Sequence, residues 1–86
     1  MKAKIIKCDG TEKDIEGSFA DIEKAIDARI LDSVNLRNGK IMLVDDMGHV
    51  ECRKQVNPKA TKLYHSVCRP GTIHQIVGDV AVIKGN

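Results

Sequence analysis

The sequence predicts an α+β fold, with a small antiparallel or mixed β-sheet of four to five strands and two helices packed on one face. Three observations support this class. Several segments alternate apolar and polar residues with period two, two others space their apolar residues as in a helix, and Asn38-Gly39 between apolar runs is a strong hairpin signal. A chain of 86 residues is long enough for one domain, 1–86, and too short for two.

The predicted strands are separated by turn signals. Strands are expected over residues 2–8, 28–37, 41–44, 49–53 and 73–83, with a short return strand at 13–16. Asn38-Gly39 predicts a type I′ turn, and Asp45-Asp46-Met47-Gly48 predicts a second turn. Three consecutive antiparallel strands are therefore expected in the middle of the chain. The last strand is apolar on both faces near its end, which is typical of a strand inside a sheet.

Each predicted helix begins at a recognisable N-cap. Ser18 precedes the first helix, with Asp21 in the first turn. Asn57 precedes the second, and Pro58 takes the first helical position, where it loses no hydrogen bond. The expected apolar faces are Phe19, Ile22, Ala25 and Ile26 in the first helix and Ala60, Leu63, Tyr64 and Val67 in the second.

Composition excludes several classes of protein. The net charge of +2 and the presence of one Tyr, one Phe and no Trp argue against a protein that coats nucleic acid. The longest apolar run is too short for a membrane helix, and the first residues lack the apolar stretch of a secretory signal. Three cysteines are too few for a disulfide scaffold. We therefore expect a cytoplasmic protein with reduced thiols.

Two motifs suggest a family. The segments Asn57-Pro58-Lys59-Ala60-Thr61 and Ile76-Val77-Gly78-Asp79, with the acidic turn at 45–48, resemble a family of small domains of unknown function carried mainly by bacteriophages and mobile elements. Many members have a Gly-Gly pair after the first helix, where this chain has Asp27-Ala28-Arg29. The resemblance implies a phage or mobile-element origin, hence the host bacterial cytoplasm, and it implies no catalytic activity.

Histidines and cysteines form a pattern that resembles a zinc site. His49 and Cys52 are three apart, as are His65 and Cys68, and two imidazoles with two thiolates suit tetrahedral Zn²⁺. Residues three apart on a strand point to opposite faces, which separates His49 from Cys52 unless a bulge intervenes. We therefore predict no bound zinc and no other cofactor. Elemental analysis showing one zinc per chain, lost in Cys52→Ser, would reverse this prediction.

The sequence offers little for catalysis. It contains no Gly-rich phosphate loop. The cysteines have apolar neighbours, which favours inert thiols, and a domain of this size has little room for a substrate cleft. Asp45 and Asp46 with Asp79 are candidate cation ligands, but paired aspartates before glycine more commonly form a turn. We expect a protein that is not an enzyme.

A basic stretch marks the candidate ligand site. Between Glu51 and Arg69 five Lys or Arg residues oppose one acidic residue, and a helix N-terminus with clustered cations attracts phosphate. The predicted ligand-binding residues are Asn57, Lys59, Lys62, Tyr64, His65 and Arg69. A solvated helix face remains the alternative interpretation of this stretch.

Two functions follow from these observations. The first is non-catalytic binding of a small anionic ligand such as a signalling nucleotide, by which a phage protein would counter a host defence system. The alternative is a protein- or nucleic-acid-interaction module that inhibits a host factor by direct contact. The small core favours a homo-oligomer.

Overall fold

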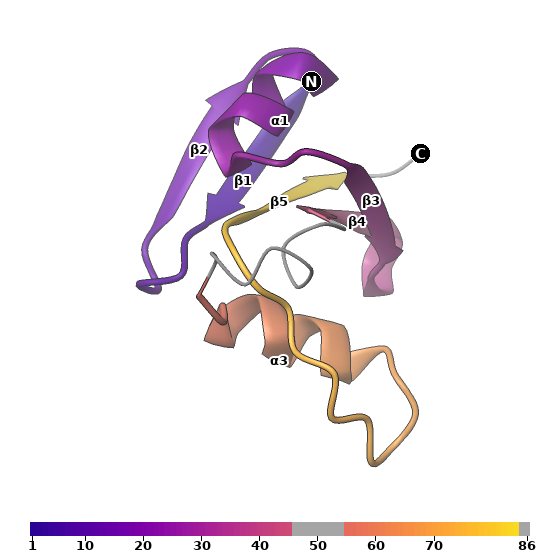
Figure 1. Ribbon diagram of the computed structural model, residues 1–86. Helices are drawn as coiled ribbons and strands as arrows, with labels where there is room; N and C mark the ends of the chain where they lie inside the picture. Colours follow the sequence, from indigo (N-terminus) through magenta and orange to yellow (C-terminus); the bar gives the residue numbers. More distant parts are fainter. Residues whose placement is uncertain (46–54, 85–86) are drawn as a thin grey trace.

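The computed structural model describes residues 1–45 and 55–84, which form a five-stranded antiparallel sheet with two α-helices (Figure 1). The sheet order is β2-β1-β5-β4-β3. The strands are β1 (Lys2–Ile6), β2 (Glu12–Glu16), β3 (Leu31–Asn35), β4 (Lys40–Asp45) and β5 (Val80–Lys84), and the helices are α1 (Phe19–Ile26) and α3 (Pro58–Ser66). The predicted α+β class is confirmed. The strand expected at 49–53 lies outside the described residues.

The last strand enters the middle of the sheet. β5 pairs with both β1 and β4, so the two halves of the sheet are joined through the C-terminal strand. Because β4 has β3 and β5 as its neighbours, it is not the centre of three consecutive strands. The prediction that this apolar strand lies inside the sheet is confirmed. Its strand region begins at Val80, and residues 73–79 contribute only a bridge between Val56 and Val77.

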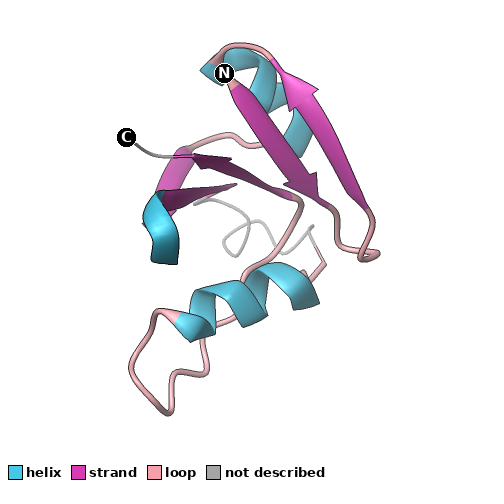
Figure 2. Cartoon of the chain, turned by 180° about the vertical axis from the view of Figure 1, so that it is seen from behind, coloured by secondary structure: helices cyan, strands magenta, loops and turns pink. Residues whose placement is uncertain are grey.

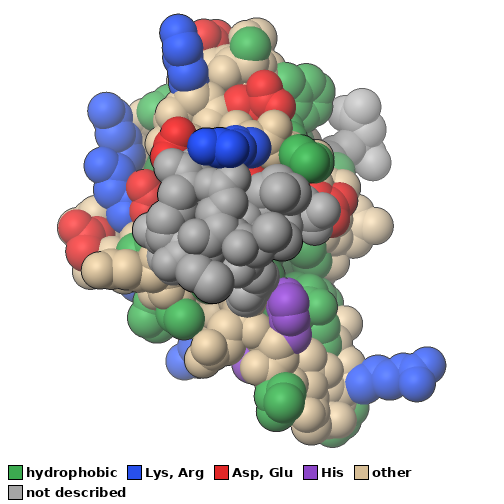
Figure 3. All heavy atoms as spheres, in the orientation of Figure 1, with side chains coloured by type: hydrophobic (Ala, Val, Ile, Leu, Met, Phe, Trp, Pro, Cys, Tyr) green, Lys and Arg blue, Asp and Glu red, His purple; other side chains and the backbone are tan. Residues whose placement is uncertain are grey.

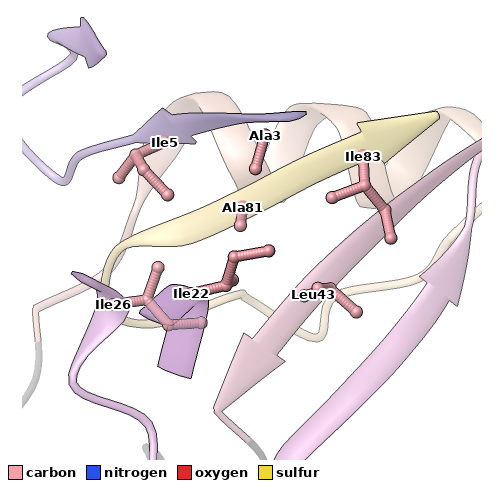
Figure 4. Close-up of a cluster of buried hydrophobic side chains, with 7 residues drawn as sticks. All are labelled: Ala3, Ile5, Ile22, Ile26, Leu43, Ala81 and Ile83. Atoms are coloured by element: carbon pink, nitrogen blue, oxygen red, sulfur yellow. The ribbon is translucent and has the colours of Figure 1, made fainter. Parts of the chain in front are cut away.

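The two helices pack on opposite faces of the sheet, which corrects the expectation of one shared face. One buried cluster contains Ile22 and Ile26 of α1 (Figure 4), and the other contains Ala60 of α3. Neighbouring residues in β1, Ile5 and Ile6, belong to different clusters. Since successive side chains of a strand point to opposite faces, the sheet separates α1 from α3. β5 and β4 lie between α1 and α3 in both views (Figure 1 and Figure 2).

A three-residue turn closes the β3–β4 hairpin. Residues Arg37–Gly39 form a 3-10 turn, and the N–H of Leu36 donates to the carbonyl of Lys40 at 2.8 Å. The hairpin was predicted correctly, but the type I′ turn was wrong, because such a turn needs a positive φ at Asn38 as well as at Gly39, and Asp27 is the one described non-glycine residue with a positive φ. Gly39 has a φ of 72°, as a three-residue loop ending in a left-handed residue requires.

Helix α1 begins as predicted but buries less of its surface. Ser18 and Asp21 form a capping box, and Ile22 and Ile26 are buried. Ala25 is exposed and Phe19 is 52% exposed, so these two residues do not share the buried face. In the described part of the chain, neither helix is long and apolar enough to cross a membrane.

Candidate functional site

Asn57 caps α3 and is fully buried. Its Oδ1 accepts a hydrogen bond from the N–H of Ala60 at 3.1 Å. Its Nδ2 donates to the carbonyl oxygens of Ile6 at 2.9 Å and Gly78 at 3.0 Å. The predicted N-cap is confirmed. The side chain joins α3 to the end of β1 and to the segment before β5, so it is not directed toward an external ligand.

Lys59 is held against the β1–β2 hairpin. Its Nζ donates to the carbonyl of Gly10 at 2.7 Å and lies 3.1 Å from Oε2 of Glu12. The hydrogen bond from Lys59 holds the pKa of Glu12 below its usual range. The positive charge of Lys59 is therefore matched by a carboxylate, which weakens the phosphate site expected at the start of α3.

Tyr64 and His65 make contacts within their own region of the protein. The Tyr64 ring lies edge-on to His74, with centroids 5.7 Å apart, and a hydrogen bond with the Cys68 side chain raises the pKa of Tyr64. Nε2 of His65 lies 2.6 Å from the carbonyl oxygen of His74, a contact in which the ring nitrogen donates. These contacts attach α3 to the segment that leads into β5.

Lys62 and Arg69 are exposed. Lys62 belongs to α3, whereas Arg69 follows its C-terminal end. Among the described residues, neither side chain has a carboxylate within 4.0 Å, unlike Lys59. Their surroundings therefore give less support for a built phosphate site than the sequence suggested.

The possible metal ligands that the structure describes do not gather at one site. His49 and Cys52 fall outside the described residues, and within the described ranges no three His, Cys, Asp or Glu side chains gather around one point. The carboxylates of Asp45 and Asp79 accept backbone N–H groups, from Arg29 at 3.2 Å and Cys8 at 3.0 Å respectively. The absence of zinc stays a prediction for elemental analysis.

Cys8 lies beside the carboxylate of Asp79. Its Sγ lies 3.4 Å from the carbonyl of Gln55, and its N–H donates to Asp79. Burial raises the pKa of the Cys8 thiol, and the nearby charge of Asp79 raises it further. A thiol with a raised pKa is a poor nucleophile at neutral pH. This geometry favours a structural role for Cys8.

A row of lysines crosses the sheet on the α3 side, beyond the part that α3 covers. Lys40 of β4 lies directly opposite Lys84 of β5. Continuing the β1–β5 register by one residue places Lys2 on the other side of Lys84, and Glu16 of β2 pairs with Lys2. We call Lys2, Lys84 and Lys40 the lysine row. Neighbouring strands are about 4.8 Å apart, so these three ammonium groups can reach one anion.

The next row of the same face is less polar and lies closer to α3. Lys4 pairs with Asp14 on one side and with Val82 on the other. Beyond it, Ile6 and Val80 are buried under α3. An open hollow of about 740 Å³ is lined by the lysine row and by the row of Asp14, Lys4 and Val82. It thus has cations at one end, two carboxylates on the β2 side, and the apolar Val82 between them.

The charges of the lysine row are not balanced by ion pairs among the described residues. Lys4 lies 3.7 Å from Oε1 of Glu12, but Lys2, Lys40 and Lys84 have no described carboxylate within 4.0 Å. Cross-strand pairs of like charge are unfavourable, so the pairing of Lys40 with Lys84 costs free energy in the absence of an anion. The arrangement is chemically suited to binding phosphate or a carboxylate.

Sequence reasoning missed the lysine row because its members are far apart in the chain. Strand periodicity correctly assigns Lys2 and Lys4 to the same face of β1. It does not reveal that β5 lies between β1 and β4, which brings residues 2, 40 and 84 together. A prediction of the strand order would have found the row.

Comparison of the chain with protein-family models, curated proteins and solved structures finds no match. The resemblance to a phage-associated family is therefore an expectation from the sequence motifs alone.

Proposed function

We propose that the protein is a non-catalytic binding protein for a small anionic ligand of the nucleotide type, and that the ligand binds at the lysine row. The observation that supports this proposal is the placement of Lys84 between Lys2 and Lys40 on adjacent strands. A phosphate bound there would offset the repulsion among the three ammonium groups. It would also accept charge-assisted hydrogen bonds, which are stronger than neutral ones.

The surroundings of the row suggest how a nucleotide would be oriented. Its phosphate would bind over Lys84 and Lys40, because Glu16 and Asp14 line the opposite side of the hollow and repel anions. Those two carboxylates accept hydrogen bonds, as ribose hydroxyls and base amino groups require. The hollow of about 740 Å³ lies within the usual size range of small-molecule sites.

The biological role in this proposal rests on the phage resemblance. A phage protein that binds a nucleotide messenger without altering it would lower the messenger's free concentration, and would thereby counter a host defence system. The described residues that line the hollow include no aromatic side chain for base stacking, which favours a phosphate-centred ligand over single-stranded nucleic acid.

Calorimetric titration with cyclic dinucleotides and ADP-ribose tests the proposed site. We expect the wild-type protein to bind at least one of these nucleotides, with weaker binding at higher salt because the contacts are ionic. The double variant Lys40→Gln with Lys84→Gln should lose this binding. The substitution removes two charges, retains long polar side chains and relieves the Lys40–Lys84 repulsion, so thermal stability should not fall.

A matched double variant on the other basic surface, Lys62→Gln with Arg69→Gln, separates the two candidate sites. It removes the same charge from exposed positions on and after α3. Binding that survives this change but not the change in the lysine row supports the sheet site. The opposite result contradicts the sheet site and places the ligand beside α3.

The alternative function predicts no nucleotide binding at all. If no nucleotide in the panel binds the wild-type protein, the ligand proposal is contradicted. Specific co-purification of a host protein, or retention of nucleic acid, would then support an interaction module that inhibits a host factor by direct contact.

A further inference from the structure

The two edges of the sheet differ in their protection against pairing with another strand. β2 (Glu12–Glu16) carries three acidic residues and a lysine in five positions, and blue and red side chains are interspersed along that flank in Figure 3. β3, at the opposite edge, has Asp32 as its one charged residue. Charges on an edge strand discourage edge-to-edge association. Within the described part of the chain, β3 pairs with β4 and with no second strand.

At this edge, the backbone groups of β3 pair with no second strand among the described residues. Alternate residues of an antiparallel strand direct their N–H and C=O groups to the same side. Leu36 directs its N–H toward β4, where it donates to Lys40. The residues that direct these groups outward are therefore Leu31, Ser33 and Asn35. Accordingly, the N–H of Ser33 donates to the carboxylate of the adjacent Asp32, at 2.8 Å, instead of to a strand.

An apolar groove lies next to the same edge. It has a volume of about 310 Å³, and its apolar lining residues are Phe19, Leu31, Ile41, Leu43 and Ile83. Ser33, at the centre of β3, also lines the groove. Phe19 is 52% exposed and Ile30, just before β3, is 51% exposed. Exposed apolar side chains beside an unpaired strand are typical of an interaction surface.

We propose that a second copy of the chain covers this edge. The two β3 strands pair antiparallel around a two-fold axis at Ser33 and join the two sheets into one. In this register Ser33 lies opposite Ser33 and Leu31 opposite Asn35, so every outward-directed residue of β3 gains a strand partner. Ile30 lies opposite Leu36, which pairs two apolar side chains.

The charges of β3 select this register over its neighbours. With the axis at Ser33, Asp32 lies opposite Val34 of the second copy, so no like charges face each other within β3. With the axis at Asp32, two aspartates oppose each other, which is unfavourable. With the axis at Val34, Leu31 falls outside the β3–β3 ladder. Of these three registers, the one with its axis at Ser33 therefore pairs the whole of β3 without repulsion between its aspartates. The proposed dimer does not depend on the proposed nucleotide site.

The groove beside β3 adds apolar surface to the proposed interface. A two-fold axis perpendicular to the sheet keeps both α1 helices on the same face of the joined sheet. Because each groove includes Ser33 and Leu31 of the edge strand, its apolar lining reaches the edge that the second copy would cover. Burial of apolar surface is the main favourable contribution to most protein association.

Light scattering coupled to size exclusion tests this proposal on the wild-type protein and three variants. We expect a wild-type mass of two chains at high micromolar concentration. Ser33→Lys places two ammonium groups opposite each other at the axis, so its mass should fall to one chain. Ser33→Thr keeps a neutral strand-forming residue, and Ala20→Lys adds the same charge at an exposed position of α1 that does not line the groove. Both controls should remain dimeric.

Two outcomes would overturn the proposal. One is a wild-type mass of a single chain at high concentration, and the other is a folded Ser33→Lys variant that remains dimeric. Amide hydrogen exchange in the wild-type protein provides a test that does not depend on any variant. Exchange at Ser33 should slow as protein concentration rises, and an unchanged rate would also contradict the interface.

Discussion

The caps of α1 and α3 satisfy the same helix-terminal groups by very different means. At α1, Ser18 and Asp21 bond to each other's backbone N–H groups within one exposed turn. At α3, the buried Asn57 bonds to Ala60 in its own helix and to carbonyls 51 and 21 residues away along the chain. The first cap is local, whereas the second also links separate parts of the fold. An N-cap residue recognised in the sequence therefore contributes more to stability at α3 than at α1.

Replacement of Asn57 by alanine should have the largest effect on stability. It removes the cap of α3 and leaves the carbonyls of Ile6 and Gly78 without their buried donor. Each unsatisfied buried group costs about 1–3 kcal/mol, so we expect the free energy of unfolding to fall by about 3 kcal/mol or more. Urea denaturation followed by circular dichroism measures this loss.

Asn57→Asp distinguishes capping from the long-range contacts. Aspartate caps helices about as well as asparagine, but it cannot donate to the two carbonyls. We expect Asn57→Asp to destabilise the protein nearly as much as Asn57→Ala. A variant as stable as the wild-type protein would show that the cap alone matters and that the comparison of the two helices is mistaken.

Gly17→Ala should be the most harmful small change at the α1 cap. A Cβ at this position would lie 2.5 Å from Oδ2 of Asp21, so the Asp21 side chain would have to move. Its hydrogen bond from the N–H of Ser18 would then be lost. We expect a decrease of about 1–2 kcal/mol in the free energy of unfolding, by loss of capping with added strain. Denaturation midpoints of Gly17→Ala and Ala20→Gly, which weakens α1 without this clash, would separate the two causes.

Ser18→Ala should have a smaller effect, because the lost hydrogen bond is local and exposed. The hydroxyl accepts from the N–H of Asp21 at 3.3 Å, and water can replace it. A typical cost is about 1 kcal/mol. Thermal and urea denaturation of Ser18→Ala beside Asn57→Ala test the comparison directly, and equal losses at the two caps would contradict it.

The smallest predicted effect is a pH dependence at the α1 cap. The hydrogen bond from the backbone N–H of Ser18 lowers the pKa of Asp21. The ionised Asp21 carboxylate therefore makes its full contribution to stability above the pKa of the unfolded state, about 4. This contribution is lost as pH falls through the lower pKa of the folded state. The stability difference between wild type and Asp21→Asn should shrink on acidification below about pH 4. A difference that is constant from neutral to acidic pH would contradict a charged cap.

The candidate site shows where prediction from sequence stopped. The basic stretch around α3 was visible because its residues are close in the chain, but Lys59 proved to pair with Glu12 of a distant strand. The lysine row was not visible, although each of its lysines occupies a strand whose alternation the sequence displays. Local periodicity assigns a side chain to one face of its own strand. Which strands lie beside it depends on the order of the strands in the sheet, which periodicity does not reveal.

The sequence by itself determined the α+β class, both helix starts, the β3–β4 hairpin and the interior position of the last strand. Each of these depends on residues within a few positions of one another: a cap with its first turn, an alternation, or a glycine at a turn. Only the tertiary structure decided that β5 lies between β1 and β4, that α1 and α3 cover opposite faces, and that Asn57 holds Ile6 and Gly78. Those features depend on which apolar faces bury one another across the whole chain, and burial depends on total packing more than on neighbours in the sequence.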